Sequence, residues 1–190
     1  MKTDKKIIKY SQLPTIRKKA RLKNKVIVLT TGCYDILHLG HLIHFDYNRF
    51  AVESLPEKTL GFQPREAYCK SKGDILVVSV GNDKTVKALK GPNRPINNEL
   101  FRARILAGLA EVDFVIISQE FGIMDHNKIV ELLRPDVYVV PGTDSMLEEK
   151  RKLIKKIGSK FITCRRLPPA HLKGGISTTQ IGKKITDEKS

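Results

Sequence analysis

Five short apolar runs recur along the chain between longer amphipathic stretches, and this alternation constrains the fold more than any other feature. The runs are Val26–Thr30, Ile75–Val80, Phe114–Ile117, Val137–Val140 and Phe161–Cys164. Most are rich in β-branched residues, as is typical of strands that are buried on both faces. Strands that alternate with helices form right-handed βαβ units and therefore a parallel sheet. We expect an α/β fold, a doubly wound parallel sheet of about five strands.

Helical patterns fill most of the space between these runs. They cover Ser11–Asn24, Asn98–Ala110, Ile123–Leu133 and Ser145–Ile157. The third pattern is ended by Arg134-Pro135, because proline cannot continue a helix. From Phe50 to Lys72 the periodicity is lost and Pro and Gly intervene. We interpret residues 50–72 as an insertion in a single domain that spans residues 1–190.

The composition narrows the class of protein. The hydrophobic fraction of 41% is ordinary for a globular chain, and no apolar run reaches the roughly 18 residues that a membrane span needs. The charged start Met1–Lys6 has no apolar stretch behind it, so we expect no signal peptide. The three cysteines are widely spaced, without a metal-binding or disulfide pattern. These features indicate a cytoplasmic protein without a membrane partner.

The formal net charge of +15 raises the question of nucleic acid binding. The Lys and Arg residues are spread along the whole chain, and few aromatic residues lie between them. Proteins that bind single strands usually place aromatic residues among their cations. We therefore favour a basic enzyme for phosphorylated substrates. A basic nucleic-acid-binding module that keeps the fold without the chemistry is the alternative from another class.

His38 and His41 follow the first apolar run and flank Gly40 in the sequence His38-Leu39-Gly40-His41. If a helix begins near Gly40, both imidazoles can point at one spot beside free helical amides, and such a spot suits an anion. We interpret the pair as donors that stabilise the charge on a phosphoryl group during displacement. A capping histidine beside a chance one is the alternative.

The residues that lead into this pair are Gly32-Cys33-Tyr34-Asp35. Gly32 permits a close approach of the backbone or a positive φ, and the amides here can line nucleotide phosphates. Cys33 could be a nucleophile, but no sequence feature indicates a lowered thiol pKa, so we do not favour that role. We interpret Asp35 as a turn or cap residue rather than a base.

Two further segments could hold anions. In Gly174-Gly175-Ile176-Ser177-Thr178-Thr179, two glycines lead into hydroxyl residues and a helical pattern. Ser177 or Thr178 can cap that helix, so the segment is either a second anion site or an ordinary N-cap.

The second segment is a basic loop after the second apolar run. It carries Lys87, Lys90 and Arg94, and Arg102 lies about one turn into the next helix. These cations can neutralise a triphosphate or an acceptor phosphate, or they form a solvated basic face.

Together these residues resemble the cytidylyltransferase-like nucleotidyltransferase superfamily, whose signature is His-x-Gly-His with a late Ile-Ser-Thr-Thr. Both motifs are present, at His38–His41 and Ile176–Thr179. Thr31–His41 is most similar to the adenylyltransferase domain of ADP-heptose synthase, and the stretches 80–87 and 94–113 run parallel to it. The resemblance implies a Rossmann-like fold of the HxGH type.

The resemblance also implies a reaction. A nucleoside monophosphate would pass from an NTP to a phosphorylated acceptor, pyrophosphate would leave, and Mg²⁺ would assist by binding through the NTP phosphates. ATP is favoured over CTP as the donor, and a sugar 1-phosphate of the heptose type is the favoured acceptor, in carbohydrate metabolism. A cytidylyltransferase for glycerol 3-phosphate or another polyol phosphate is the alternative. Members of the family are commonly homodimers, so a second copy of the chain is a candidate partner.

By the same analogy His38 and His41 stabilise the α-phosphate. The expected nucleotide-binding residues are Thr31, Gly32, Cys33, Tyr34, Asp35, Gly40, Arg102, Gly142, Gly175, Ile176, Ser177, Thr178 and Thr179. The expected phosphate- or acceptor-binding residues are Lys87, Lys90 and Arg94. The chain departs from the family at Gln180, where a basic residue is usual. It departs again at Pro141-Gly142-Thr143-Asp144, where the heptose-type domain has Lys-Gly-Gly-Asp.

Overall fold

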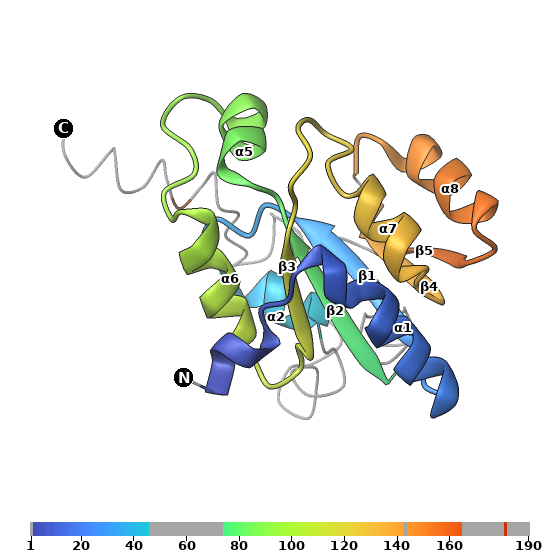
Figure 1. Ribbon diagram of the computed structural model, residues 1–190. Coiled ribbons are helices and arrows are strands. Elements are labelled where there is room, and N and C mark those ends of the chain that lie inside the picture. The colour runs from blue at the N-terminus through green and yellow to red at the C-terminus, as the bar shows by residue number, and fades with distance from the viewer. Residues whose placement is uncertain (1, 46–73, 143, 165–180, 182–190) are drawn as a thin grey trace, which may run out of the picture.

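A five-stranded parallel sheet forms the centre of the computed structural model (Figure 1), which describes residues 2–45, 74–142, 144–164 and 181. The strands are β1 (Ile27–Gly32), β2 (Ile75–Val80), β3 (Phe114–Ile117), β4 (Val137–Pro141) and β5 (Lys160–Cys164). Their order is β3-β2-β1-β4-β5, and every neighbouring pair is parallel. The prediction of a doubly wound parallel sheet is confirmed, and each strand begins or ends within one residue of its predicted bounds.

Helices cover both faces of this sheet. They are α1 (Leu13–Leu22), α2 (Leu39–Phe45), α5 (Asp83–Lys90), α6 (Glu99–Ala107), α7 (Asn127–Leu133) and α8 (Leu147–Lys156), with short 3-10 helices η1 (Lys2–Lys6) and η2 (Tyr10–Gln12). Figure 1 shows α1 and α7 on one side of the sheet and α2 on the other. The four predicted helices are present but shorter. For example, α6 begins after Asn98, whose side chain accepts from the Phe101 N–H.

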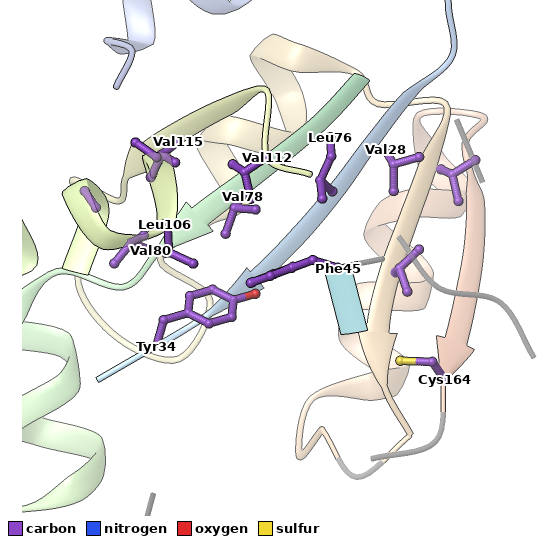
Figure 2. Close-up of a cluster of buried hydrophobic side chains, with 14 residues drawn as sticks. Val28, Tyr34, Phe45, Leu76, Val78, Val80, Leu106, Val112, Val115 and Cys164 are labelled. Atoms are coloured by element: carbon purple, nitrogen blue, oxygen red, sulfur yellow. The ribbon is translucent and has the colours of Figure 1, made fainter. Parts of the chain in front are cut away.

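The core has two halves, one on each face of the sheet. In β1, Val28 points to the half that contains Phe45 of α2 and Leu106 of α6 (Figure 2). Ile27 and Leu29 point to the other half, which contains residues of α1, α7 and α8. Because both faces are covered, the strands have continuous apolar sequences instead of alternating ones.

The interpretation of the segment after β2 as a basic loop is wrong for its first half. Residues Asp83–Lys90 form α5, because the Asn82 side chain accepts from the Thr85 N–H at 2.8 Å and so caps the helix. Gly91, with φ of +102°, ends it. Lys87 and Lys90 therefore lie in the last turn of a helix.

Two predictions fall outside the described residues: the insertion at residues 50–72, and the second anion site at Gly175, Ile176, Ser177, Thr178 and Thr179. Within the described residues, every helix is too short or too polar to cross a bilayer.

Candidate active site

The order of the strands identifies one point on the carboxyl edge of the sheet where a ligand is expected to bind. From β1 the chain continues to β2 on one side, and it later returns to β4 on the other side. Ligands of open α/β sheets bind outside the strand ends at such a switch point. The loops that leave it begin at residue 33 after β1 and at residue 142 after β4.

His38 and His41 lie at this point, where the first loop enters α2. Their ring centroids are 4.0 Å apart, and the His41 N–H donates to the His38 carbonyl at 2.8 Å. The His38 N–H donates to His41 Nδ1 at 3.3 Å. In a neutral imidazole the nitrogen that accepts carries no proton, so His41 carries its proton on Nε2. The structure therefore brings the two predicted imidazoles together, with His41 Nε2 as a donor.

Gly32 and Tyr34 fit together just before the histidines. Tyr34 is buried with φ of +50°, and its ring centroid lies 5.5 Å from those of His41 and Phe45. Figure 2 shows the Tyr34 ring pointing toward Phe45. A Cβ on Gly32 would lie 2.9 Å from Tyr34 Cζ. Glycine is therefore required at position 32 by the packing of this ring.

Thr31 and Gly40, two other predicted nucleotide-binding residues, are buried. The Thr31 hydroxyl lies 2.9 Å from the Tyr138 hydroxyl, across to β4. Burial raises the pKa of Tyr138, so the phenol stays protonated. The Thr31 side chain thus joins β1 to β4 near the switch point.

Asp35 anchors the loop after β1. Its buried carboxylate accepts from the Ile96 N–H at 2.8 Å and the Asn97 N–H at 3.1 Å, and it pairs with Arg94 Nη1 at 2.6 Å. The Asp35 carbonyl accepts from Asn97 Nδ2 at 3.0 Å. This geometry fits the interpretation of Asp35 as a turn residue, and it commits the Arg94 side chain to a carboxylate.

Arg102 is enclosed by protein acceptors. Its side chain is 0% exposed. Nε donates to the Asn97 carbonyl at 2.9 Å, Nη2 to Asp83 Oδ1 at 2.8 Å, and Nη1 to the Cys33 carbonyl. We expected Arg94 and Arg102 to be open to phosphate. The structure shows both in scaffold contacts instead, because acceptors from the neighbouring loops surround them.

Lys87 and Lys90, by contrast, are exposed on α5. Lys90 lies near enough to Cys33 to affect its thiol. Burial raises the pKa of Cys33, and the charges of Lys90 and Arg102 only partly oppose that effect. A protonated thiol is a poor nucleophile, so the structure does not favour covalent catalysis by Cys33.

His44 is a structural residue that the sequence analysis did not identify. His44 Nε2 lies 2.9 Å from Thr30 Oγ1, and His44 Nδ1 lies 3.3 Å from Cys164 Sγ, so the ring connects β1 with β5. Burial lowers the pKa of His44 to about 4, so the ring is neutral at pH 7. The position of His44, three residues after His41 on α2, was the available signal.

A buried polar network behind β2 and β3 also went unpredicted. Ser79 Oγ lies 2.7 Å from His126 Nδ1, and His126 Nε2 lies 2.9 Å from Asp125 Oδ1. Ser118 donates to Asp125 and accepts from the Asn82 N–H at 2.9 Å. The order of groups is that of a hydrolase triad, but Ser79 is 0% exposed and cannot meet a substrate. The network instead fixes Asn82, the cap of α5.

The second loop, after β4, carries Gly142 and an ion pair. Gly142 is exposed, and its N–H donates to the Cys164 carbonyl at 2.7 Å. Asp144 Oδ2 lies 2.6 Å from Lys150 Nζ of α8. Across the described residues, no three His, Cys, Asp or Glu side chains gather in a way that could hold a metal ion.

Comparison with known proteins identifies relatives along the whole chain. No family model matches. Bifunctional protein HldE of Campylobacter jejuni strain RM1221 is 34% identical over 189 residues, which are 100% of this chain and 33% of HldE. HldE of Koribacter versatilis is 37% identical over 137 residues, covering 72% of this chain and 23% of that protein. The chain thus spans about a third of the length of the first of these relatives.

Solved structures agree with this assignment. A lipopolysaccharide core biosynthesis protein from Thermoplasma volcanium superposes with a TM-score of 0.55 and 26% identity, covering 75% of this chain and 96% of that chain. A pantoate-beta-alanine ligase from Francisella tularensis, 17% identical, shares the fold with a TM-score of 0.60, over 96% of this chain and 76% of that one. The chain therefore has the cytidylyltransferase-like fold of HxGH nucleotidyltransferases, and it is similar along its whole length to one third of HldE.

Proposed function

We propose that this chain transfers a nucleoside monophosphate from an NTP to a phosphorylated acceptor and releases pyrophosphate. The observation that carries the proposal is the convergence of His38 and His41, with ring centroids 4.0 Å apart, at the switch point of the sheet. The match to HldE over the whole chain supports the same reaction class.

In the proposed reaction, an acceptor phosphate oxygen attacks the α-phosphorus of the NTP. A new P–O bond forms, the bond between the α-phosphorus and the bridging oxygen breaks, and pyrophosphate leaves with that electron pair. The His41 Nε2–H and the His38 ring would donate to the α-phosphate oxygens, where negative charge must be stabilised in the transition state. No residue forms a covalent bond to the nucleotide.

The exposed cations of α5 would bind the remaining negative charge of the substrates. Lys87 and Lys90 lie in the last turn of a helix whose start is fixed by Asn82. Their ammonium groups can neutralise the β- and γ-phosphates or the acceptor phosphate. Mg²⁺ would enter with the triphosphate as its counter-ion and neutralise phosphate charge.

We propose ATP as donor and a sugar 1-phosphate of the heptose type as acceptor. The similarity to HldE and to a lipopolysaccharide core biosynthesis protein supports this choice. The alternative, CTP with glycerol 3-phosphate or another polyol phosphate, rests on the loop at Pro141–Asp144, which departs from the heptose-type pattern.

The test is pyrophosphate release by the purified chain with ATP or CTP against a panel of sugar and polyol phosphates. We expect release with ATP and heptose 1-phosphate. Release only with CTP and glycerol 3-phosphate would favour the alternative acceptor. No release with any pair, together with salt-sensitive binding of RNA, would contradict the enzyme and favour the nucleic-acid-binding module.

A further inference from the structure

Helix α6 carries apolar residues on both of its sides. On the side that packs against the sheet, the buried residues are Arg102, Ala103, Leu106 and Ala107. On the other side Leu100, Phe101 and Ile105 are 42%, 53% and 47% exposed. Together with Arg104, which is 48% exposed, these three residues form the α6 face. A surface helix normally turns polar residues to water, and clustered exposed apolar residues mark interaction sites.

The α6 face is poor in charge, although the chain carries a net charge of +15. The helices α1, α5 and α8 each expose at least three Lys or Arg side chains, whereas α6 exposes one, Arg104. Figure 1 shows the basic helix α8 on the side of the molecule away from α6. The cores of protein interfaces are likewise depleted of charge. Two copies of so basic a chain can approach closely where charges are few, and the α6 face is such a place.

The order of residues on the α6 face makes it complementary to itself. In an antiparallel pair of α6 helices with a two-fold axis between positions 102 and 103, Leu100 lies opposite Ile105 of the second copy. The same axis sets Phe101 opposite Arg104 of the second copy. Apolar side chains then meet each other, and each guanidinium lies over an aromatic ring in a favourable cation–π contact. A parallel pair would instead bring the two copies of Arg104 together.

Arg104 can make that contact at little cost. Its Nε lies 3.4 Å from Asp4 Oδ1 of η1, and the Asp4 side chain is 43% exposed. An exposed ion pair of this kind contributes at most about 1 kcal/mol. The Asp4 carboxylate also places a negative charge beside the guanidinium, which lowers the repulsion between two copies of the face.

We propose that two copies of this chain associate through the α6 face, with their α6 helices antiparallel. Ile96, which is 56% exposed in the loop before α6, extends the contact. A standard interface buries roughly 800 Å² on each partner, more than one face of a nine-residue helix supplies, so we expect a reversible dimer. The inference does not rest on the proposed function, because association needs no substrate.

Sedimentation equilibrium of the full chain tests the association. We expect a monomer–dimer equilibrium with a Kd of roughly 1–30 μM. The variant L100E places a carboxylate opposite Ile105 of the second copy, and it should weaken the dimer at least about thirtyfold. The matched control is L22E, which makes the same change at a leucine of α1 that is 76% exposed. L22E should associate like the wild type.

The salt dependence distinguishes a second copy from an acidic partner. Two chains that each carry a charge of +15 repel one another, so raising the salt from about 50 mM to about 500 mM should strengthen the dimer about threefold or more. Binding of a nucleic acid or another polyanion weakens with salt instead. A wild-type dimer that dissociates as salt is added would contradict direct contact between two α6 faces.

An exchange of two residues tests the antiparallel arrangement. F101R sets guanidinium groups of the two copies opposite one another and should weaken the dimer about tenfold or more. The double variant F101R/R104F exchanges the residues and restores the pairing of ring with cation, so its Kd should return to within about threefold of the wild-type value. A double variant as impaired as F101R alone would rule out this arrangement.

Two further results would overturn the inference. A wild-type chain that stays monomeric at about 200 μM would mean that no second copy covers the α6 face. A dimer that L100E leaves intact would mean that the copies meet elsewhere. If L100E does not fold, F101R and the double variant decide, because Phe101 and Arg104 are half-exposed. Absence of turnover by an intact dimer counts against the proposed function alone.

Discussion

Two groups of cations surround the loop after β1, and they are built in opposite ways. Arg94 and Arg102 turn inward: the first pairs with buried Asp35, and the second is 0% exposed among three protein acceptors. Lys87 and Lys90 lie exposed on α5. In the sequence all four look like phosphate ligands. The difference shows that the arginines hold the loops of the site in place, whereas the lysines are exposed and can bind a ligand.

Arg102→Met tests the inward group and should have the largest effect. The change leaves the Asp83 carboxylate and two carbonyls without their donor, so the free energy of unfolding should fall by about 3 kcal/mol. Urea denaturation measures it. Arg104→Met is the control, since Arg104 is 48% exposed and pairs with Asp4 at 3.4 Å. It should cost less than about 1 kcal/mol. Equal losses in both variants would mean that Arg102 is no scaffold residue.

His38→Ala and His41→Ala test the groups left for the ligand. Each should lower kcat by roughly 10²-fold or more, the usual cost of losing one electrostatic donor. The free energy of unfolding should change by less than about 1 kcal/mol, because neither ring is fully enclosed by the core. Steady-state kinetics beside urea denaturation measure the two effects. Near-wild-type turnover in either variant would refute the role assigned to that histidine.

The pH dependence of stability sharpens the contrast between His41 and His44 on one helix. His44 has a folded pKa of about 4 against an ordinary value of 6.5. Below pH 6.5 the unfolded chain binds a proton on His44, whereas the folded chain does not bind it until the pH approaches 4. Stability due to His44 is thus constant above that pH and falls between pH 6.5 and 4, by at most about 1.4 kcal/mol per pH unit.

His44→Asn should flatten that part of the stability curve, measured by urea denaturation at several pH values. Asp136 does not interfere in this window. Burial would raise its pKa, but Arg17 and the Ile27 N–H outweigh burial and lower it below the ordinary 3.8. The contribution of Asp136 to the free energy of unfolding is therefore lost only at lower pH. The same slope in the wild type and the variant would rule out a buried neutral His44.

Lys87→Ala and Lys90→Ala should have the smallest effects. Each should raise the KM for one phosphorylated substrate by roughly fivefold, and the free energy of unfolding should change by less than about 0.5 kcal/mol. Lys19→Ala, an exposed change on α1, serves as the control and should alter neither quantity. If the KM values for both substrates are unchanged in the α5 variants, Lys87 and Lys90 form a solvated basic face and do not bind a substrate.

The strands could be predicted from the sequence because burial on both faces leaves a simple record, a run such as Val26–Thr30 with no polar alternation. The histidine pair could be predicted equally well, since both residues lie in one tetrapeptide. The role of Arg102 was not, because its acceptors come from residues 33, 83 and 97, which are distant along the chain. The Ser79–His126 contact spans 47 positions and has no local signal either. α5 was not predicted, because its start depends on the Asn82 cap, whereas the lysines near its end are equally compatible with a basic loop.

The packing of Tyr34 over Gly32 has a consequence for how the sequence can change in evolution. An aromatic ring occupies the space that any side chain at position 32 would need, so substitutions at the two positions are coupled. A lineage that gains a side chain at 32 must first shrink or move the ring at 34, and the ring in turn rests against His41 at 5.5 Å. We expect aligned sequences to vary at these two positions jointly, with the glycine lost only where the tyrosine is already gone.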